Sequence, residues 1–249
     1  MKKNNLIQFN SLVIIGLVLI ITNGCSKNSD SNDSSQNGRI IFNPNLTYGT
    51  VTDIDGNSYK TITIGTQTWM AENLKTTRYR DSTLIPNVTN NTLWYNLTTG
   101  AYCDYGNTPT NGATYGKVYN WHAVKDVRNI CPVGWHVPTE AEMEILGAYL
   151  GGYQVIGGKM KERGITHWVI SNEGATNESG FTALPGGMRY FDGPFIDFHL
   201  GGYWWSSSKA DDYYDLEAHY YFLSGNGNNN FLDGYGNKTN GMSVRCVKD

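Results

Sequence analysis

Charged residues are scarce in this chain of 249 residues. They make up 16% of it, and the formal net charge is −3. Proteins that bind nucleic acid carry a basic patch as their electrostatic footprint. A chain with few charges and a slight excess of acid lacks that footprint, so we expect no nucleic-acid partner.

The motifs of several enzyme classes are missing as well. The five histidines include no pair at the HExxH spacing, and there is no Gly-x-Ser-x-Gly elbow, phosphate-binding loop or dinucleotide fingerprint. Glu140 and Glu142 are close in sequence, but two residues apart at a helix start they point to different faces. The sequence therefore predicts no catalytic residue, no metal ligand and no cofactor, and favours a protein that is not an enzyme.

No apolar run is long enough for a comfortable membrane span. The run at residues 12–21 follows a basic start and precedes Gly24 and Cys25, as in a secretory signal peptide. A cysteine directly after a small residue at the cleavage point is typical of bacterial lipoproteins, in which the thiol is acylated. We expect residues 1–24 to be a lipoprotein signal peptide and Cys25 to carry the lipid. An ordinary secreted protein, with Cys25 incidental, is the alternative.

The segment after this cysteine has no apolar residue from Ser26 to Gly38. Such a segment cannot bury a core, and we expect residues 25–49 to form a disordered polar tether and a short lead-in. A tether of this kind holds a lipid-anchored domain away from a membrane. The sequence thus predicts an exported protein of the cell envelope, an outer-membrane lipoprotein that meets the membrane through its N-terminal lipid.

A β-hairpin is predicted at residues 50–64. An Asp-Gly-Asn turn lies there between alternating β-formers, which is a strong hairpin signal. A calcium loop starting at Asp53 is the competing interpretation. Such a loop needs Gly at its sixth position and Glu at its twelfth, and these are Ser58 and Ile64. The hairpin is therefore favoured, and calcium is left without support.

Two helices and a final strand are predicted further along. One helix is expected near residues 119–127 and the other over residues 139–150. The second begins with a capping box, Thr139 and Glu142, followed by apolar residues at helical spacing. The last strand is expected at residues 242–247, with short strands and Gly-rich turns before it.

Distinctive blocks follow one another from residue 52 to the end of the sequence. They are TDIDGNSYKT at 52–61, IGTQTWMAENLK at 64–75, YGKVYNW at 115–121, CPVGWHVPT at 131–139, GGKMK at 157–161, ATNESGFTALPGG at 175–187, YWWSSS at 203–208 and SVRCVKD at 243–249. In this order they resemble the Fibrobacter succinogenes major paralogous domain, a family typical of bacterial envelopes that has no assigned reaction. The resemblance implies one domain over residues 50–249.

A more distant resemblance concerns the fold. Residues 135–142 (WHVPTEAE) are similar to the helix start of sulfatase-modifying, formylglycine-generating proteins, although Met143 replaces the usual Trp. Those proteins share the C-type-lectin-like fold, so the resemblance implies an α+β domain with two helices, a small antiparallel sheet and long loops. Their oxidase chemistry needs two nearby cysteines that hold copper, and the C-terminal region here has only Cys246.

The cysteines form an odd set for an oxidising compartment. If one of the four is acylated, Cys103, Cys131 and Cys246 remain, and one disulfide with one free thiol is the simplest count. Lectin-like domains commonly join a position near the first helices to the last strand. The resemblance therefore favours the pair Cys131–Cys246, with Cys103–Cys246 as the alternative.

Aromatic residues are plentiful, at 13% of the chain with 17 Tyr and 7 Trp. Tyr and Trp give a large, rigid contact area at low entropic cost, which suits recognition. Of the residues in the aromatic, Gly-punctuated loops and the acidic turn nearby, we expect these to contact a ligand: Phe195, His199, Asp211 and Asp212. Asp211 and Asp212 could also hold calcium, but a solvated turn is favoured.

These observations favour a non-catalytic binding module that is displayed on the cell envelope and binds a glycan or a protein. Long loops on a small core are where binding residues usually lie. The alternatives are a structural or assembly component of the cell surface and an envelope enzyme with an unrecognised site.

Overall fold

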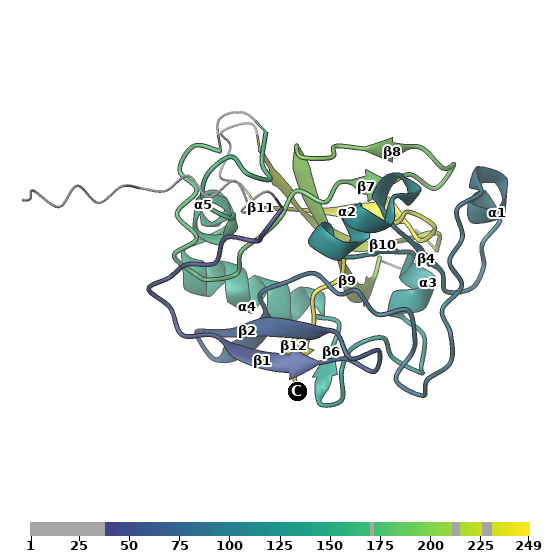
Figure 1. The fold of residues 1–249 in the computed structure, drawn as a ribbon, viewed down its shortest axis with the longest axis horizontal. Helices are drawn as coiled ribbons and strands as arrows, with labels where there is room; N and C mark the ends of the chain where they lie inside the picture. The colour runs from purple at the N-terminus through teal and green to yellow at the C-terminus, as the bar shows by residue number, and fades with distance from the viewer. Residues whose placement is uncertain (1–37, 170–171, 211–214, 226–230) are drawn as a thin grey trace, which may run out of the picture. The chain divides into compact units, whose positions relative to one another are not determined.

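The structure is a computed structural model that describes residues 38–169, 172–210, 215–225 and 231–249 (Figure 1). The predicted signal peptide and Cys25 lie outside the described residues, and so do Asp211 and Asp212. The described residues combine short helices with strands that pair in antiparallel sheets, so the prediction of a mixed α+β fold is confirmed.

Five α-helices occur in the described residues, so the prediction of two was wrong in number. They are α1 (Asn91–Tyr95), α2 (Pro109–Tyr115), α3 (Trp121–Val124), α4 (Glu140–Leu150) and α5 (Ile156–Met160). The helix expected near 119–127 is the single turn α3, which starts where the Asn120 side chain accepts a hydrogen bond from the Ala123 N–H. Helices α1, α2 and α5 were not predicted from the sequence, because five to seven residues are too few to show a 3.6-residue period.

Helix α4 forms as its sequence predicts. The Thr139 Oγ1 accepts from the Glu142 N–H at 3.3 Å, and the Glu142 carboxylate accepts from the Thr139 N–H at 2.8 Å. These two bonds satisfy N–H groups that a helix start otherwise leaves without partners. Gly151 ends the helix in the left-handed region, at φ 105°. The capping box therefore fixes where α4 begins, and the helical spacing of Met143, Leu146 and Leu150 sets the face that it buries.

Glu142 also binds His136, and this contact predicts a pH-dependent contribution to stability. The His136 ring lies 2.8 Å from the Glu142 carboxylate and 2.6 Å from that of Asp249. Partial burial lowers the pKa of His136, but the hydrogen bonds to Asp249 and Glu142 outweigh it and raise that pKa above 6.5. Burial opposes ionisation of Glu142 too, yet the bonds from Thr139 and His136 hold its pKa below 4.5.

A raised histidine pKa stabilises the fold below about pH 6.5, and this stabilisation is lost as the pH rises through the folded-state pKa. A lowered carboxyl pKa stabilises it above about pH 4.5, and this is lost as the pH falls through the folded-state value. We therefore expect His136→Gln to cost about 1 kcal/mol or less between these limits, and progressively less above neutral pH. Urea unfolding at a series of pH values measures this. His122→Gln is the control, since burial and then Lys238 lower the pKa of His122. A cost that grows above neutral pH would contradict the prediction.

The strands form four sheets. In chain order they are β1 (Gly49–Thr52), β2 (Ser58–Ile64), β3 (Gln67–Met70), β4 (Tyr102–Cys103), β5 (Val118–Tyr119), β6 (Trp135–His136), β7 (Met188–Arg189), β8 (Phe195–Ile196), β9 (Gly201–Lys209), β10 (Glu217–Ser224), β11 (Phe231–Asn237) and β12 (Val247–Lys248). One sheet has the order β1-β2-β3-β12-β6, another β11-β10-β9, and β4-β5 and β7-β8 are pairs. Strand β12 lies between β3 and β6, close to the C-terminus (Figure 1).

The predicted hairpin is β1–β2, which is confirmed with Thr52 opposite Ser58. Its turn is organised by Asp53, whose carboxylate accepts hydrogen bonds from the backbone N–H groups of Asp55 and Asn57 and from the Tyr59 hydroxyl. Both carboxylate oxygens of Asp53 are thus occupied within the turn. This agrees with a hairpin turn in place of a calcium loop.

The predicted last strand is only partly regular. Met242 and Ser243 make isolated bridges to Tyr119 and Trp204, and regular pairing is limited to Val247–Lys248. The chain is extended there but passes several partners in turn. Strand propensity could predict the extension, whereas the changes of partner depend on the fold around it.

The three-stranded sheet separates two hydrophobic clusters. Side chains alternate across it: Trp204, Tyr221 and Leu223 pack with helices α4 and α5, whereas Tyr203 and Trp205 face the cluster that holds the disulfide. This is the two-residue period of a strand with both faces covered. Both Trp of the YWWSSS block, Trp204 and Trp205, are buried.

The structure joins Cys131 and Cys246 in a disulfide, the pair that the lectin-like resemblance favours. Cys103 is free and buried, and its Sγ accepts a hydrogen bond from Arg189 at 3.4 Å. Burial raises the pKa of the Cys103 thiol to about 12. A thiol of this kind is inert at neutral pH, so Cys103 has the properties of a structural residue.

The lead-in lies against the domain from residue 38. The Ile41 N–H donates to the buried carboxylate of Glu162 at 2.6 Å, and the Asn43 side chain donates to the carbonyl of Asn177 at 3.0 Å. Glu162 in turn binds the ring of His167 at 2.7 Å. The lead-in is therefore anchored by specific hydrogen bonds before β1 begins.

Candidate functional site

Two of the residues expected to contact a ligand, Phe195 and His199, lie in the described part of the chain, and both contact other residues of the domain. Phe195 is half-buried on β8, with its ring 5.1 Å from that of Tyr105 and 5.0 Å from the Arg189 guanidinium. The His199 Nδ1 lies 2.7 Å from the carbonyl oxygen of His167 and 3.1 Å from the hydroxyl of Tyr115. Both side chains therefore help to hold their loops in place.

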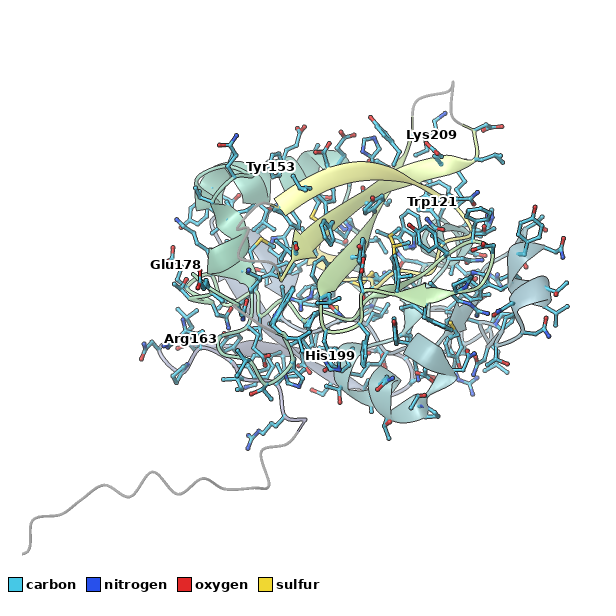
Figure 2. The ribbon with its side chains drawn as sticks, turned by 90° about the horizontal axis from the view of Figure 1, so that it is seen from above. Trp121, Tyr153, Arg163, Glu178, His199 and Lys209 are labelled. Carbon is cyan, nitrogen blue, oxygen red and sulfur yellow. A yellow bond between two sulfur atoms is a disulfide. The ribbon has the colours of Figure 1, made fainter. Side chains whose placement is uncertain are left out.

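A surface groove lies elsewhere, made of two adjoining hollows that share Phe191 and Asn237. The first, of about 430 Å³, we call the tyrosine hollow, after four lining residues: Tyr190, Tyr203, Tyr220 and Tyr235. The second, of about 490 Å³, we call the lysine hollow, because Lys238 lines it. Trp121 lies under Lys238, with its ring 5.2 Å from the ammonium. Figure 2 shows that His199 lies well apart from Trp121, and thus from this end of the groove.

Strands β9, β10 and β11 build the floor of the tyrosine hollow. Tyr220 on β10 pairs with Gly234 on β11, and its ring lies over the glycines of that strand. A Cβ at Gly236 would come within 3.1 Å of the Tyr220 ring and 3.2 Å of the Met242 side chain. A side chain at that position would require these neighbours to shift by a few tenths of an ångström, so glycine lets the ring approach the backbone closely. The FLDGYGN sequence of β11 thus makes room for the hollow.

The β7–β8 hairpin supplies the opposite wall. Its turn is closed by a bond from the Tyr190 N–H to the Pro194 carbonyl at 2.8 Å, which leaves Tyr190 and Phe191 exposed. Beyond β8, Asp197 adopts a left-handed φ of 58°, and its carbonyl accepts from the N–H groups of Leu200 and Gly201. This turn brings the Asp197 carboxylate to the Tyr203 hydroxyl, which donates to it.

Acceptor oxygens dominate the tyrosine hollow. Asp197 and Glu217 line it, and none of its lining residues in the described chain is Lys, Arg or His. Asn240 also lines it, is only 6% exposed, and its Oδ1 has no hydrogen-bond partner among the described residues. An unsatisfied buried acceptor is uncommon and points to a bound group or water.

Two phenols of the hollow, those of Tyr203 and Tyr220, have a raised pKa. Burial, and then the hydrogen bond to Asp197, raises the pKa of Tyr203 well above its usual value. Burial, followed by the nearby Tyr190 and Glu217, raises the pKa of Tyr220. The tyrosines therefore offer uncharged ring faces, with the formal charge of the hollow residing on its two carboxylates.

The lysine hollow is more balanced in charge. The Lys238 ammonium donates to the carbonyl of Asp215, and the Asp215 carboxylate lies 4.0 Å from it. Tyr95 and Phe191 flank this end, with ring centroids 6.1 Å apart and both side chains exposed. Because Lys238 is already bound to Asp215, the main feature of the lysine hollow is the surface of the Tyr95 and Phe191 rings.

The described residues contain no group of three or more His, Cys, Asp or Glu side chains placed to hold a metal ion. Nor does any helix there combine the length and apolarity needed to cross a membrane. The arrangement that stands out is therefore the aromatic groove.

Phe195 and His199 do not line the tyrosine hollow, although they come from the same stretch of sequence as two residues that do. Tyr190 and Asp197 belong to the aromatic stretch that drew attention to Phe195 and His199, but the β7–β8 turn sends Phe195 away from the groove. Glu217 and the tyrosines of β10 and β11 were missed. The sequence holds no regular signal for them, since Tyr220 and Tyr221 are adjacent in β10 and β11 has one tyrosine, Tyr235, between two glycines.

Comparison with known proteins gives a family and no close relative. Searches of curated proteins and of solved structures found no match. The model of the Fibrobacter succinogenes major domain matches residues 62–248, which is most of the chain. The chain therefore belongs to this family.

Proposed function

We propose that the domain is a non-catalytic module that binds carbohydrate in the aromatic groove. The observation that carries this proposal is the combination of four tyrosines with the acceptors Asp197, Glu217 and Asn240 in one hollow. Aromatic faces suit the apolar faces of sugar rings, and carboxylate and amide oxygens accept hydrogen bonds from sugar hydroxyls. The two hollows in line give room for an extended chain of sugar units.

The same proposal includes a C-type-lectin-like arrangement of the domain. It is supported by the disulfide from the loop after α3 to the segment before β12, and by the long connections that carry the groove. We expect binding in this groove to be independent of calcium, because ring faces and acceptor oxygens can contact a sugar directly. A glycan array run with and without calcium tests both points.

Removal of exposed tyrosines from the groove should weaken binding without unfolding the protein. Tyr190 is 42% exposed and Tyr235 is 48% exposed, so both rings are open to a ligand. The Tyr235 ring also contacts that of His219 at 4.5 Å, so Tyr190→Ala is the change expected to disturb packing less. We expect each change to weaken glycan binding about tenfold, as loss of one stacking contact implies. Tyr149→Ala on α4 is the matched control, since that ring is 64% exposed and outside the groove. Calorimetry with an array-selected glycan measures the affinity; equal losses in all three variants would contradict the groove as the site.

We further propose that the domain is displayed on the cell envelope by a lipid on Cys25. The support is the apolar run, the Gly24–Cys25 junction and the polar segment that follows. We expect radiolabelled palmitate to be incorporated into the wild type and lost in Cys25→Ala. Cys103→Ala is the control, because that thiol is buried. Equal labelling of the wild type and Cys25→Ala would contradict the lipid anchor.

Two competing functions make different demands. An enzyme should release product from a polysaccharide that the groove binds, and a structural component should self-associate without a soluble ligand. Incubation of the array-selected glycan with the protein, followed by analysis of reducing ends, tests the first. Sedimentation over a range of concentrations tests the second.

A further inference from the structure

The charge of the tyrosine hollow is one-sided. Asp197 comes from the turn after β8 and Glu217 from the start of β10, so carboxylates reach the hollow from two different elements. Among the described lining residues no basic side chain balances them. Two cations are next to lining residues along the chain, Arg189 and Lys238. Arg189 is fully buried, with its guanidinium over the Trp94 ring. Lys238 lies in the adjoining hollow, over the Trp121 ring and bound to Asp215. An anionic ligand would therefore be repelled.

The remaining polar groups are arranged to receive donors. The Asn240 Oδ1 is buried and has no partner among the described residues. The Asn237 Oδ1, by contrast, already accepts from the N–H and hydroxyl of Thr239. The Tyr203 hydroxyl donates to one oxygen, Oδ2, of the Asp197 carboxylate and holds this carboxylate in place. Two carboxylates and a free amide oxygen match a group with several N–H donors and a positive charge.

The aromatic walls favour the same kind of group. A cation over a tyrosine face is attracted by the ring quadrupole, and cages of aromatic rings with nearby carboxylates recognise organic ammonium ions. The rings of Tyr203 and Tyr220 lie 6.0 Å apart at 41° and form two sides of such a cage. The protein places its own cations over other rings, as with Arg189 over Trp94 at 4.3 Å. None of the cation–ring contacts found among the described residues uses Tyr203 or Tyr220.

We infer that the tyrosine hollow binds a protonated amine, so that the glycans taken by the groove are those with free amino sugars. This inference rests on the proposed carbohydrate-binding function and narrows its ligand class. An acetylated amine has lost the charge and two of the three N–H donors. A uronate has the opposite charge. The hollow therefore distinguishes sugars with a free, protonated amine from sugars whose amine is acetylated.

Two oligosaccharides that differ only at that nitrogen test the inference. They are the tetramers of glucosamine and of N-acetylglucosamine, titrated into the full chain by calorimetry at about pH 6, where the amine is largely protonated. We expect the glucosamine tetramer to bind about tenfold more tightly, and the difference to shrink with added salt. Equal affinities, or tighter binding of the acetylated tetramer, would overturn the inference and leave the carbohydrate-binding function standing.

A charge-neutralising variant separates the carboxylate from general damage to the groove. Glu217→Gln keeps the shape of the side chain, and we expect it to weaken glucosamine-tetramer binding about tenfold with little effect on an uncharged ligand. Glu144→Gln, at an exposed position on α4, is the matched control and should change neither. Equal weakening of both ligands by Glu217→Gln would count against an ammonium contact. If no glycan of any kind binds, the proposed function fails, and this inference fails with it.

Discussion

Reduction of the Cys131–Cys246 disulfide is expected to lower the free energy of unfolding by about 4–5 kcal/mol. The bond closes a loop with a sequence separation of 115 residues. In the chain-entropy account, a cross-link over a loop of this length removes that much conformational freedom from the unfolded chain. Both cysteines are buried in the hydrophobic cluster on the Trp205 side of the three-stranded sheet. We therefore expect the folded structure to change little on reduction, so that the lost stability reflects the greater freedom of the unfolded chain.

Urea unfolding with and without reductant measures this effect. The double variant Cys131→Ala and Cys246→Ala should be about as unstable as the reduced wild type, and reductant should not change it further. The comparison isolates the cross-link because Cys103 has a buried, free thiol in every case. A reduced protein that unfolds at the same urea concentration as the oxidised one would show that the bond does not constrain the unfolded chain.

Local signals were enough to predict the parts of the fold that local interactions determine. Helix α4 begins at Thr139 because the capping box is a contact between residues three apart, and such contacts are visible in a sequence. The β1–β2 turn is organised by Asp53 within five residues, and an Asp-Gly-Asn sequence signals it. The disulfide, by contrast, was suggested by resemblance to lectin-like domains.

The sheet order could not be predicted, because it depends on residues far apart in the chain. Strand β12 has two residues and pairs with β3 on one side and β6 on the other. Nothing in Val247 and Lys248 themselves encodes those partners. Very short strands and the isolated bridges of Met242 and Ser243 are set by the packing around them.

The same limit applies to the site. The aromatic stretch before β9 led to the prediction of a binding surface, but the β7–β8 turn determines which of its rings face a groove. The other wall depends on the register that places Tyr220 opposite Gly234. A one-residue change in register would turn these side chains to the opposite face. Composition therefore predicted recognition by aromatic residues, and the location of the groove required the structure.

A large effect is also expected from substitution of Arg245, which is fully buried. Its guanidinium donates to the Asn73 side-chain oxygen at 2.9 Å, to the Thr182 carbonyl at 2.8 Å and to the Phe181 carbonyl. The guanidinium also lies 4.2 Å from the centre of the Phe181 ring. Burial lowers the pKa of Arg245, and these oxygens and the ring compensate for the loss of water.

Arg245→Met keeps much of the apolar stem but leaves the carbonyls of Phe181 and Thr182 without that donor. Each buried acceptor left without a partner costs about 1–3 kcal/mol, so we expect a loss of about 3–4 kcal/mol in the free energy of unfolding. Arg245→Lys should lose nearly as much, because one ammonium cannot reach three oxygens in the geometry of a planar fork.

Urea unfolding of these variants measures the loss, with Arg163→Met as the matched control, since Arg163 is exposed (Figure 2). That change should stay within about 0.5 kcal/mol of the wild type. The Asn73 oxygen keeps a second donor, the Trp204 indole N–H at 2.8 Å, so the loss at Arg245 arises mainly at the two carbonyls. A loss below about 1 kcal/mol in Arg245→Met would mean that water or a local shift satisfies those carbonyls. Arg245 would then contribute only its packing in the core, and its hydrogen bonds to Asn73 and to the carbonyls of residues 181 and 182 would not be needed for stability.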